Sequence, residues 1–249
     1  MKLKRRVIYL GIVFFLISIT GCVYLHLLEV RRQLFNFEDN FEIRDQNELT
    51  LVFLKPVLLT EDIIWLTELG PTSEEETGQG KLWKYTFEKQ YSGPKDEKGD
   101  FDIPIIMLFQ GDDKLREIRF PERFLEFVSK PLLIRTFKSM GYSQISKLRR
   151  SATSKFQGSS MEIPRKQFIL NVLGKPSDTE NSDHTSKFVY KYNLRKGKPA
   201  DKDFKILVNF TFQQGDDKLR KAEGSLGDMK LFMDFSVDGS DSGKNGNNR

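Results

Sequence analysis

The hexapeptide Gly-Asp-Asp-Lys-Leu-Arg stands at residues 111–116 and again at residues 215–220 of this 249-residue chain. The two copies are 104 residues apart, and each follows an apolar stretch that ends in Phe-Gln. Looser matches surround them, such as Tyr-Thr-Phe at residues 85–87 and Tyr-Lys-Tyr at residues 190–192. An offset of about one hundred residues is the usual size of one domain. The body of the protein is therefore predicted to be a duplicated module.

Each module is predicted to combine a helix with an antiparallel sheet. Gly and Asp tolerate the backbone dihedrals of tight turns, so both hexapeptides are predicted to be hairpin turns between strands. In the first module, residues 49–120, we expect a helix from about residue 60 to 69, a polar loop at 72–79, and strands at 49–54, 82–87, 103–109 and 115–120. In the second, residues 161–236, we expect a helix at 165–173 and strands at 187–194, 204–212, 219 onward and 229–235. The predicted fold class is α+β, with two duplicated helix-plus-antiparallel-sheet modules behind an N-terminal membrane anchor.

Three further segments flank or join the modules. Residues 23–48 are predicted to be a tether, because residues 29–48 are polar and mostly acidic. Residues 121–160 are predicted to form a basic helical connector whose helices are broken at Pro131 and Gly141. Residues 237–249 are rich in Gly, Ser, Asp and Asn, which is typical of a disordered tail.

The N-terminus has the pattern of a secretory signal. Four cations at residues 2–6 precede an apolar run over residues 7–19, which ends in Ile-Thr-Gly-Cys at residues 19–22. The last four residues resemble the lipobox of bacterial lipoproteins, which implies lipid attachment to Cys22 and cleavage before it. Cys22 is also the only cysteine of the chain, so no intramolecular disulfide can form.

An uncleaved signal anchor is the alternative. Residues 7–28 carry no Lys, Arg, Asp or Glu, and about 20 apolar residues suffice to cross a bilayer. Both interpretations leave the N-terminal cations in the cytoplasm and place the body outside it. Val23 lacks the acidic character that, by resemblance to lipoproteins, accompanies inner-membrane retention. The outer membrane is therefore preferred over the plasma membrane.

The charge of the chain does not indicate a nucleic-acid partner. The formal net charge of +5 falls to +1 once the four N-terminal cations are removed. The remaining charge is uneven, because no acidic residue occurs between Glu126 and Glu162. This stretch is either a solvated connector or a contact surface for anionic lipid headgroups or an acidic partner. Its cations are Lys130, Arg135, Lys138, Lys147, Arg149, Arg150 and Lys155.

The sequence offers little catalytic chemistry. The pairs Asp112–Asp113 and Asp216–Asp217 could hold a divalent cation through oxygen ligands, but their place in predicted turns explains them without metal. His26 and His184 have no companion visible in the sequence, and Trp65 and Trp83 are expected in the core. We expect no enzyme activity, cofactor or metal.

Short motifs resemble a known family of lipoproteins. Leu-Gly-Pro at residues 69–71 precedes Leu-Trp-Lys-Tyr at 82–85, and Leu-Gly-Lys-Pro at 173–176 precedes Phe-Val-Tyr at 188–190. With the lipobox, they resemble the SmpA/OmlA family of small outer-membrane-assembly lipoproteins and the tandem fold of beta-lactamase-inhibitory protein.

The expected function follows from the anchor and from this resemblance. It is that of a membrane-anchored extracytoplasmic lipoprotein with a non-catalytic protein-binding or envelope-structural role. Its partners would be the membrane and another envelope protein. The alternatives are an inhibitor of an extracytoplasmic enzyme and a metal-dependent enzyme that uses the paired Asp turns.

Overall fold

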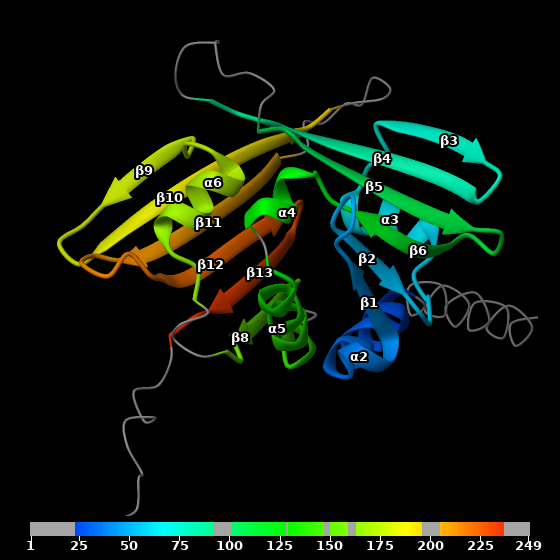
Figure 1. The fold of residues 1–249 in the computed structure, drawn as a ribbon, viewed down its shortest axis with the longest axis horizontal. Helices are drawn as coiled ribbons and strands as arrows, with labels where there is room; N and C mark the ends of the chain where they lie inside the picture. Colours follow the sequence, from blue (N-terminus) through cyan, green and yellow to red (C-terminus); the bar gives the residue numbers. More distant parts are fainter. Residues whose placement is uncertain are drawn as a thin grey trace, which may run out of the picture.

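The protein is an α+β fold in which helices cover one face of a large sheet (Figure 1). The computed structural model describes residues 23–91, 101–127, 129–146, 150–158, 163–195 and 205–236. The strands of the main path run in the order β1-β2-β6-β5-β4-β10-β11-β12-β13-β8-β7, with β3 beside β4 and β9 beside β10. All pairs are antiparallel except β13 with β8. The strands are β1 (Phe41–Arg44), β2 (Thr50–Phe53), β3 (Ser73–Thr77), β4 (Gly80–Lys89), β5 (Ile103–Gln110), β6 (Lys114–Arg119), β7 (Gln144–Ser146), β8 (Ser151–Lys155), β9 (Asp178–Asn181), β10 (Thr185–Leu194), β11 (Lys205–Gln213), β12 (Leu219–Leu226) and β13 (Met229–Asp234).

The helices lie against the apolar face of this sheet. Residues 23–35 are helical, and the other helices are α2 (Phe37–Asn40), α3 (Thr60–Thr67), α4 (Arg123–Phe127), α5 (Lys130–Gly141) and α6 (Lys166–Leu173). Helix α5 begins where the Ser129 side chain accepts a hydrogen bond from the Leu132 N–H, with Pro131 in the first turn. Pro131 therefore starts this helix instead of breaking one.

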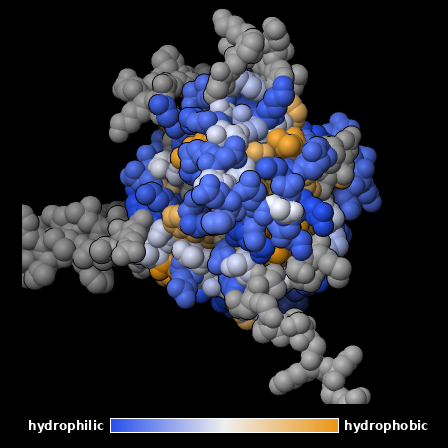
Figure 2. Space-filling model, turned by 90° about the vertical axis from the view of Figure 1, so that its left-hand side faces the viewer, coloured by the Kyte–Doolittle hydropathy of each residue, from blue (hydrophilic) through white to orange (hydrophobic). Residues whose placement is uncertain are grey.

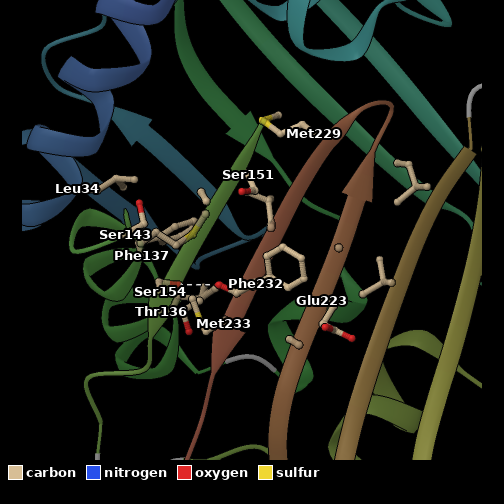
Figure 3. Close-up of a pocket in the computed structure, with 18 of the residues that line it drawn as sticks. Leu34, Thr136, Phe137, Ser143, Ser151, Ser154, Glu223, Met229, Phe232 and Met233 are labelled. Atoms are coloured by element: carbon tan, nitrogen blue, oxygen red, sulfur yellow. Dashed lines mark hydrogen bonds between the residues drawn. The ribbon is translucent and has the colours of Figure 1, made fainter. Parts of the chain in front are cut away.

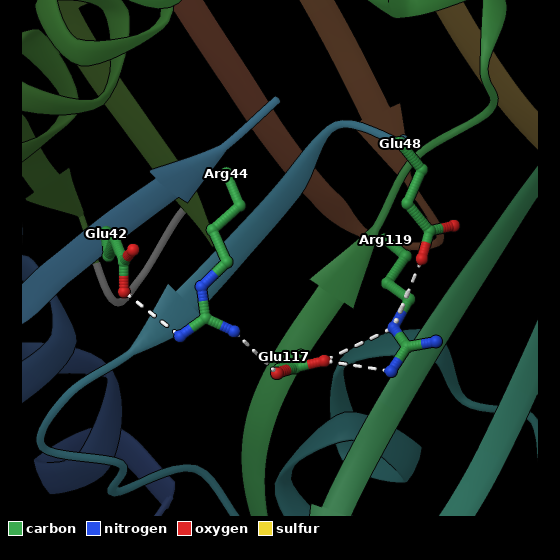
Figure 4. A network of polar contacts seen from close by, with 5 residues as sticks. All are labelled: Glu42, Arg44, Glu48, Glu117 and Arg119. Atoms are coloured by element: carbon green, nitrogen blue, oxygen red, sulfur yellow. Dashed lines mark hydrogen bonds and ion pairs between the residues drawn. The ribbon is translucent and has the colours of Figure 1, made fainter. Parts of the chain in front are cut away.

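Two groups of buried side chains form the core, one beneath each half of the sheet. The first joins Ile63 of α3 to Trp83, Tyr85 and Phe109, and the second joins Ile169 of α6 to rings of β10 and β11. Side chains alternate along each strand, so the opposite face of the sheet carries polar residues. On that face Glu42, Arg44, Glu117, Arg119 and Glu48 form a chain of ion pairs across β1, β2 and β6 (Figure 4). Apolar side chains form only small, separate patches on the face of the molecule seen in Figure 2.

The order of elements in the first half recurs in the second. The first half has α3, β3, β4, β5 and β6, and the second has α6, β9, β10, β11 and β12. In each half, the tyrosine in the middle of the long central strand donates a hydrogen bond to a carbonyl just after the helix. These bonds are Tyr85 Oη to Leu69 O at 3.2 Å and Tyr190 Oη to Gly174 O at 2.8 Å.

The Gly-Asp-Asp part of each hexapeptide lies in an exposed hairpin turn, as the sequence predicted. In each, the second aspartate has a positive φ, 56° at Asp113 and 53° at Asp217. Its carbonyl accepts a hydrogen bond from the first N–H of the helix, Thr60 in one half (3.2 Å) and Lys166 in the other (2.9 Å). The leucine two residues on is completely buried in both turns. The repeated sequence thus ties each hairpin to the N-terminus of its helix.

The two halves meet edge to edge at β4 and β10, where Figure 1 shows the strands crossing. Glu88 pairs with Asn193 at the centre of this short ladder. Beyond it, Gln90 N–H donates to Lys191 O and Arg195 N–H donates to Thr86 O, both at 2.8 Å. The two bonds are reciprocal and lie at opposite ends of the ladder.

Two hydroxyl groups extend the contact between the halves. Thr72 Oγ1 accepts from Thr86 N–H of its own half and donates to Arg195 O of the other half. Ser177 Oγ likewise accepts from Lys191 N–H and donates to Gln90 O. A side-chain hydroxyl therefore links the two halves at each end of this junction.

Residues 23–48, expected to be a tether, belong to the fold. The helix over residues 23–35, α2 and β1 place Phe37, Phe41 and Ile43 in the first core group, each at most 3% exposed. The acidic residues of this segment alternate with these apolar ones and lie on the outside. The polar composition of this segment therefore led to the wrong prediction of a tether, because its apolar residues share one buried face.

The segment 121–160, expected to be a helical connector, also contains strands. Strands β7 and β8 follow α5, and β8 extends the sheet beside β13. Gly141 ends α5 where a Cβ atom would lie 2.4 Å from the backbone nitrogen of Phe35. Glycine at this position lets the helix over residues 23–35 approach α5 closely.

Three further expectations concern loops and termini. The polar stretch 72–79 contains β3, so it is not a loop, because its backbone pairs with β4. The part of the chain that the structure describes has no helix long and apolar enough to cross a bilayer. Residues 1–22, with the predicted signal and Cys22, and the predicted tail 237–249 lie outside the described residues.

Candidate binding cavity

An apolar cavity of about 750 Å³ lies between the sheet and the helices that cover it (Figure 3). Its floor is the inner face of β10 to β13 and β8, and its walls include α3, α4, α5, α6 and the helix over residues 23–35. Most of the lining side chains are aliphatic or aromatic, among them Leu34, Phe137, Val208, Phe210 and Leu231. This volume falls within the range of about 300–1,000 Å³ that is usual for ligand pockets.

Contacts between α2 and α5 close the cavity on the side opposite the sheet. Phe37 of α2 stacks on Phe137 of α5 with 5.9 Å between ring centroids, and Lys138 of α5 forms an ion pair with Glu38. This ammonium group lowers the pKa of the Glu38 carboxyl through a hydrogen bond. The elements beside β1 and beside β7 are thereby brought together over the inner face of the sheet.

Exposed apolar side chains border the cavity. Leu28, Ile145 and Leu231 all line it, yet they are 37%, 39% and 38% exposed. They come from the helix over residues 23–35, from β7 and from β13. These side chains define the mouth of the cavity.

Most polar side chains of the lining already have partners. Arg150 forms ion pairs with Asp228 (3.0 Å) and Glu68 (3.7 Å), and its guanidinium lies 5.3 Å from the Trp65 ring centroid. The Thr136 hydroxyl donates to Leu132 O at 2.8 Å. Glu223 borders the cavity but binds Lys221 at 2.6 Å. These groups are satisfied without a ligand.

Two polar atoms of the lining have no hydrogen-bond partner within the described residues: Nε of Arg31 and the hydroxyl of Tyr192. Tyr192 is 2% exposed, and its burial strongly raises the pKa of its hydroxyl. It is therefore a neutral donor at neutral pH. Arg31 is a half-buried cation that the helix over residues 23–35 contributes to a largely apolar lining.

Five of the seven cations of the predicted contact surface lie in the described residues, and two of these five form ion pairs with carboxylates. Lys138 and Arg150 pair with carboxylates from distant parts of the chain, Glu38, Glu68 and Asp228. Lys130 and Arg135 are exposed on α5 and Lys155 is exposed on β8, whereas Lys147 and Arg149 lie outside the described residues. Of the five cations that the structure describes, Arg150 lines the cavity. The absence of nearby acids in the sequence did not mean their absence in space.

The paired aspartates stay apart in the two turns. Asp112 binds Lys114 at 2.6 Å, which lowers the pKa of its carboxyl, and Asp113 binds Lys81 at 3.1 Å. Asp216 pairs with Arg220, and Asp217 with Lys166. The described residues contain no cluster of three or more His, Cys, Asp or Glu suited to a metal ion.

His26 has a companion that the sequence did not reveal. Its Nδ1 lies 2.7 Å from Oδ2 of Asp62, which is 2% exposed and also accepts the Leu59 N–H at the start of α3. This contact joins the helix over residues 23–35 to α3. His184 is exposed in the turn between β9 and β10.

No signal in the sequence marked the cavity, because its lining comes from segments spread over more than two hundred residues. No known protein family matches the chain, and neither a curated protein nor a solved structure shows significant similarity to it.

Proposed function

We propose that this protein is a membrane-anchored, non-catalytic binding protein of the cell envelope, and that its apolar cavity is the binding site. The observation that carries the proposal is the cavity of about 750 Å³ with a largely aliphatic and aromatic lining. Such a surface binds an apolar group by removing it from water.

The body is proposed to be two copies of one module. The repeated hexapeptide, the matching order of elements, the paired tyrosine contacts and the reciprocal bonds at the junction all support this proposal. The resemblance to the SmpA/OmlA family and to the beta-lactamase-inhibitory-protein fold remains part of the proposal, on the short motifs that suggested it.

The anchor places the binding site close to a membrane. We propose that Cys22 carries the lipid, with an uncleaved signal anchor as the alternative, and that the body faces away from the cytoplasm. Tyr24, two residues after Cys22, already lines the cavity. The wall of the site therefore begins almost at the attachment point.

A second candidate is binding of another envelope protein at an exposed aromatic pair. The rings of Phe35 and Tyr142 pack with centroids 4.6 Å apart, yet they are 46% and 52% exposed. Exposed aromatic side chains of this kind are frequent anchors of protein interfaces. An inhibitor of an extracytoplasmic enzyme would be one form of this second function.

The test of the cavity is a substitution that fills it. Gly224 of β12 pairs with Val208 and Leu231, whose side chains line the cavity, so a side chain at this position enters the same space. A Cβ atom there would meet its nearest neighbour at 4.0 Å, which is an ordinary contact. Gly224→Leu is therefore expected to fold and to fill part of the cavity.

The measurement is the fluorescence of an uncharged apolar probe, N-phenyl-1-naphthylamine, with the full chain held in a fluorinated surfactant. The wild-type protein is expected to bind the probe, and Gly224→Leu to weaken binding about tenfold. Gly111→Leu is the matched control, because Gly111 is exposed and has open space around it. Equal probe binding by wild type and Gly224→Leu would reject the cavity as the site.

A further inference from the structure

Arg31 differs from every other charged group of the cavity lining. Its Nε is buried and has no hydrogen-bond partner among the residues that the structure describes. Arg150 and Glu223, by contrast, are bound to opposite charges. The adjacent Arg32 points elsewhere and is bonded twice to Glu29, at 2.7 and 2.8 Å.

Arg31 as a whole is half-buried, but a guanidinium nitrogen that is buried without a hydrogen-bond partner is unfavourable. Desolvation of a charged group costs free energy that an opposite charge and hydrogen bonds offset. Guanidinium is also suited to bind the two oxygens of a carboxylate or phosphate. The cavity therefore combines apolar walls with one site that favours an anion.

We infer that the cavity binds a single long-chain amphiphile with one anionic head group. Its head group would pair with Arg31, and its chain would lie against the apolar wall formed by Leu34, Phe137, Val208 and Leu231. This inference rests on the proposed function and specifies the ligand of the same cavity. A free fatty acid and a lysophospholipid share this chemistry.

The mouth of the cavity suits entry from a membrane. Leu28, which borders it, belongs to the helix that follows Cys22, and Leu25 on the same helix is 65% exposed. Exposed leucines beside an anchor can contact acyl chains at the bilayer surface. An amphiphile could pass from the bilayer into the cavity with little of its chain in water.

The test is photocrosslinking of the full-length protein in liposomes. The probe is palmitic acid with a diazirine on its chain, and mass spectrometry locates the labelled peptides. Wild-type protein is expected to be labelled in peptides that line the cavity. Arg31→Gln is expected to lower labelling about tenfold, as for loss of one charge-assisted contact, whereas Arg32→Gln leaves it unchanged.

Two further variants distinguish loss of the positive charge from loss of the cavity or of the fold as the cause of reduced labelling. Arg31→Lys keeps the positive charge and is expected to restore most of the labelling that Arg31→Gln loses. Gly224→Leu is expected to reduce labelling by every probe, because it occupies the space itself. Thermal melting of each variant verifies that it is folded.

Changes of the probe head group complete the experiment. A diazirine fatty alcohol, which has no charge, is expected to label Arg31→Gln and wild type equally. A diazirine lysophosphatidylglycerol distinguishes a phospholipid source from a free fatty acid, and stronger labelling by either anion supports the inference. If Arg31→Gln lowers labelling by the acid and by the alcohol equally, the inference of an anionic ligand is rejected, whereas the proposed binding function of the cavity is not. Labelling outside the cavity that Gly224→Leu does not change would overturn both.

Discussion

At the scale of single residues, the second aspartate of each hexapeptide explains why this sequence occurs twice. Asp113 and Asp217 adopt the left-handed conformation, which Asp tolerates better than most residues because its short side chain bonds locally. That conformation directs their carbonyl oxygens to the first N–H of α3 and of α6. Their carboxylates bind nearby lysines, so the acids need no metal to account for them.

The backbone conformation at Asp113 predicts a difference between two substitutions. Asp113→Val places a β-branched residue at positive φ and is expected to lower the free energy of unfolding by about 1 kcal/mol. Asp113→Asn, which also tolerates this conformation, should change it much less. Urea denaturation gives both values, and Asp112→Val is the control because φ at Asp112 is not positive. Equal losses for Val at the two positions would contradict this explanation of the turn.

At the scale of elements, the junction of β4 and β10 relies on a few bonds. The two strands share only three residue pairs, from Phe87 to Lys89 on one side and from Tyr192 to Leu194 on the other. The hydroxyl groups of Thr72 and Ser177 extend this junction beyond the ladder at both ends. Each satisfies one backbone N–H of its own half and one carbonyl of the other half.

Removal of these hydroxyls is expected to have unequal effects. Ser177 is 3% exposed, so Ser177→Ala would leave two backbone groups without partners in a dry environment, at a cost of about 1–3 kcal/mol. Thr72→Ala is expected to cost less, because Thr72 is only half-buried and water can replace its hydroxyl. Thermal or urea unfolding of both variants and of the double variant tests this order. A larger loss of stability for Thr72→Ala than for Ser177→Ala would show that the exposure of the hydroxyl does not set its contribution.

For the whole molecule, the helix over residues 23–35, which follows the proposed anchor, lines the candidate cavity. It packs on α3 through the edge-to-face pair of Tyr24 and Trp65, and on α5 beside Gly141. It also supplies Arg31 and Leu28 to the cavity. The proposed attachment to the membrane and the proposed binding site are therefore joined by one short helix.

The anchor itself is tested by Cys22→Ser. The lipoprotein proposal expects wild-type protein to incorporate a labelled fatty acid and to lack residues 1–21, because the lipid is attached to the Cys22 sulfur. Cys22→Ser should incorporate no label and should accumulate as the longer precursor. Intact-mass measurement of the membrane protein decides the alternative, since Met1 retained with no acyl mass would identify an uncleaved signal anchor.

Structures that depend on residues close together in the chain could be predicted from the sequence. Both hexapeptide turns, the helix that begins near Thr60 and the apolar strands on either side of each turn follow from turn chemistry and local patterning. The α+β class followed from the same signals. These features were predictable because residues close in the sequence create them.

Which surfaces are buried together depends instead on the packing of distant segments. This packing placed Phe37 and Phe41 of the expected tether in the core and paired the polar strand β3 with β4. It also paired two cations of the expected connector, Lys138 and Arg150, with Glu38, Glu68 and Asp228. It also enclosed the cavity, where Nε of Arg31 has no hydrogen-bond partner among the described residues. These features rest on contacts between residues far apart in the chain, whose burial and pairing no local pattern specifies.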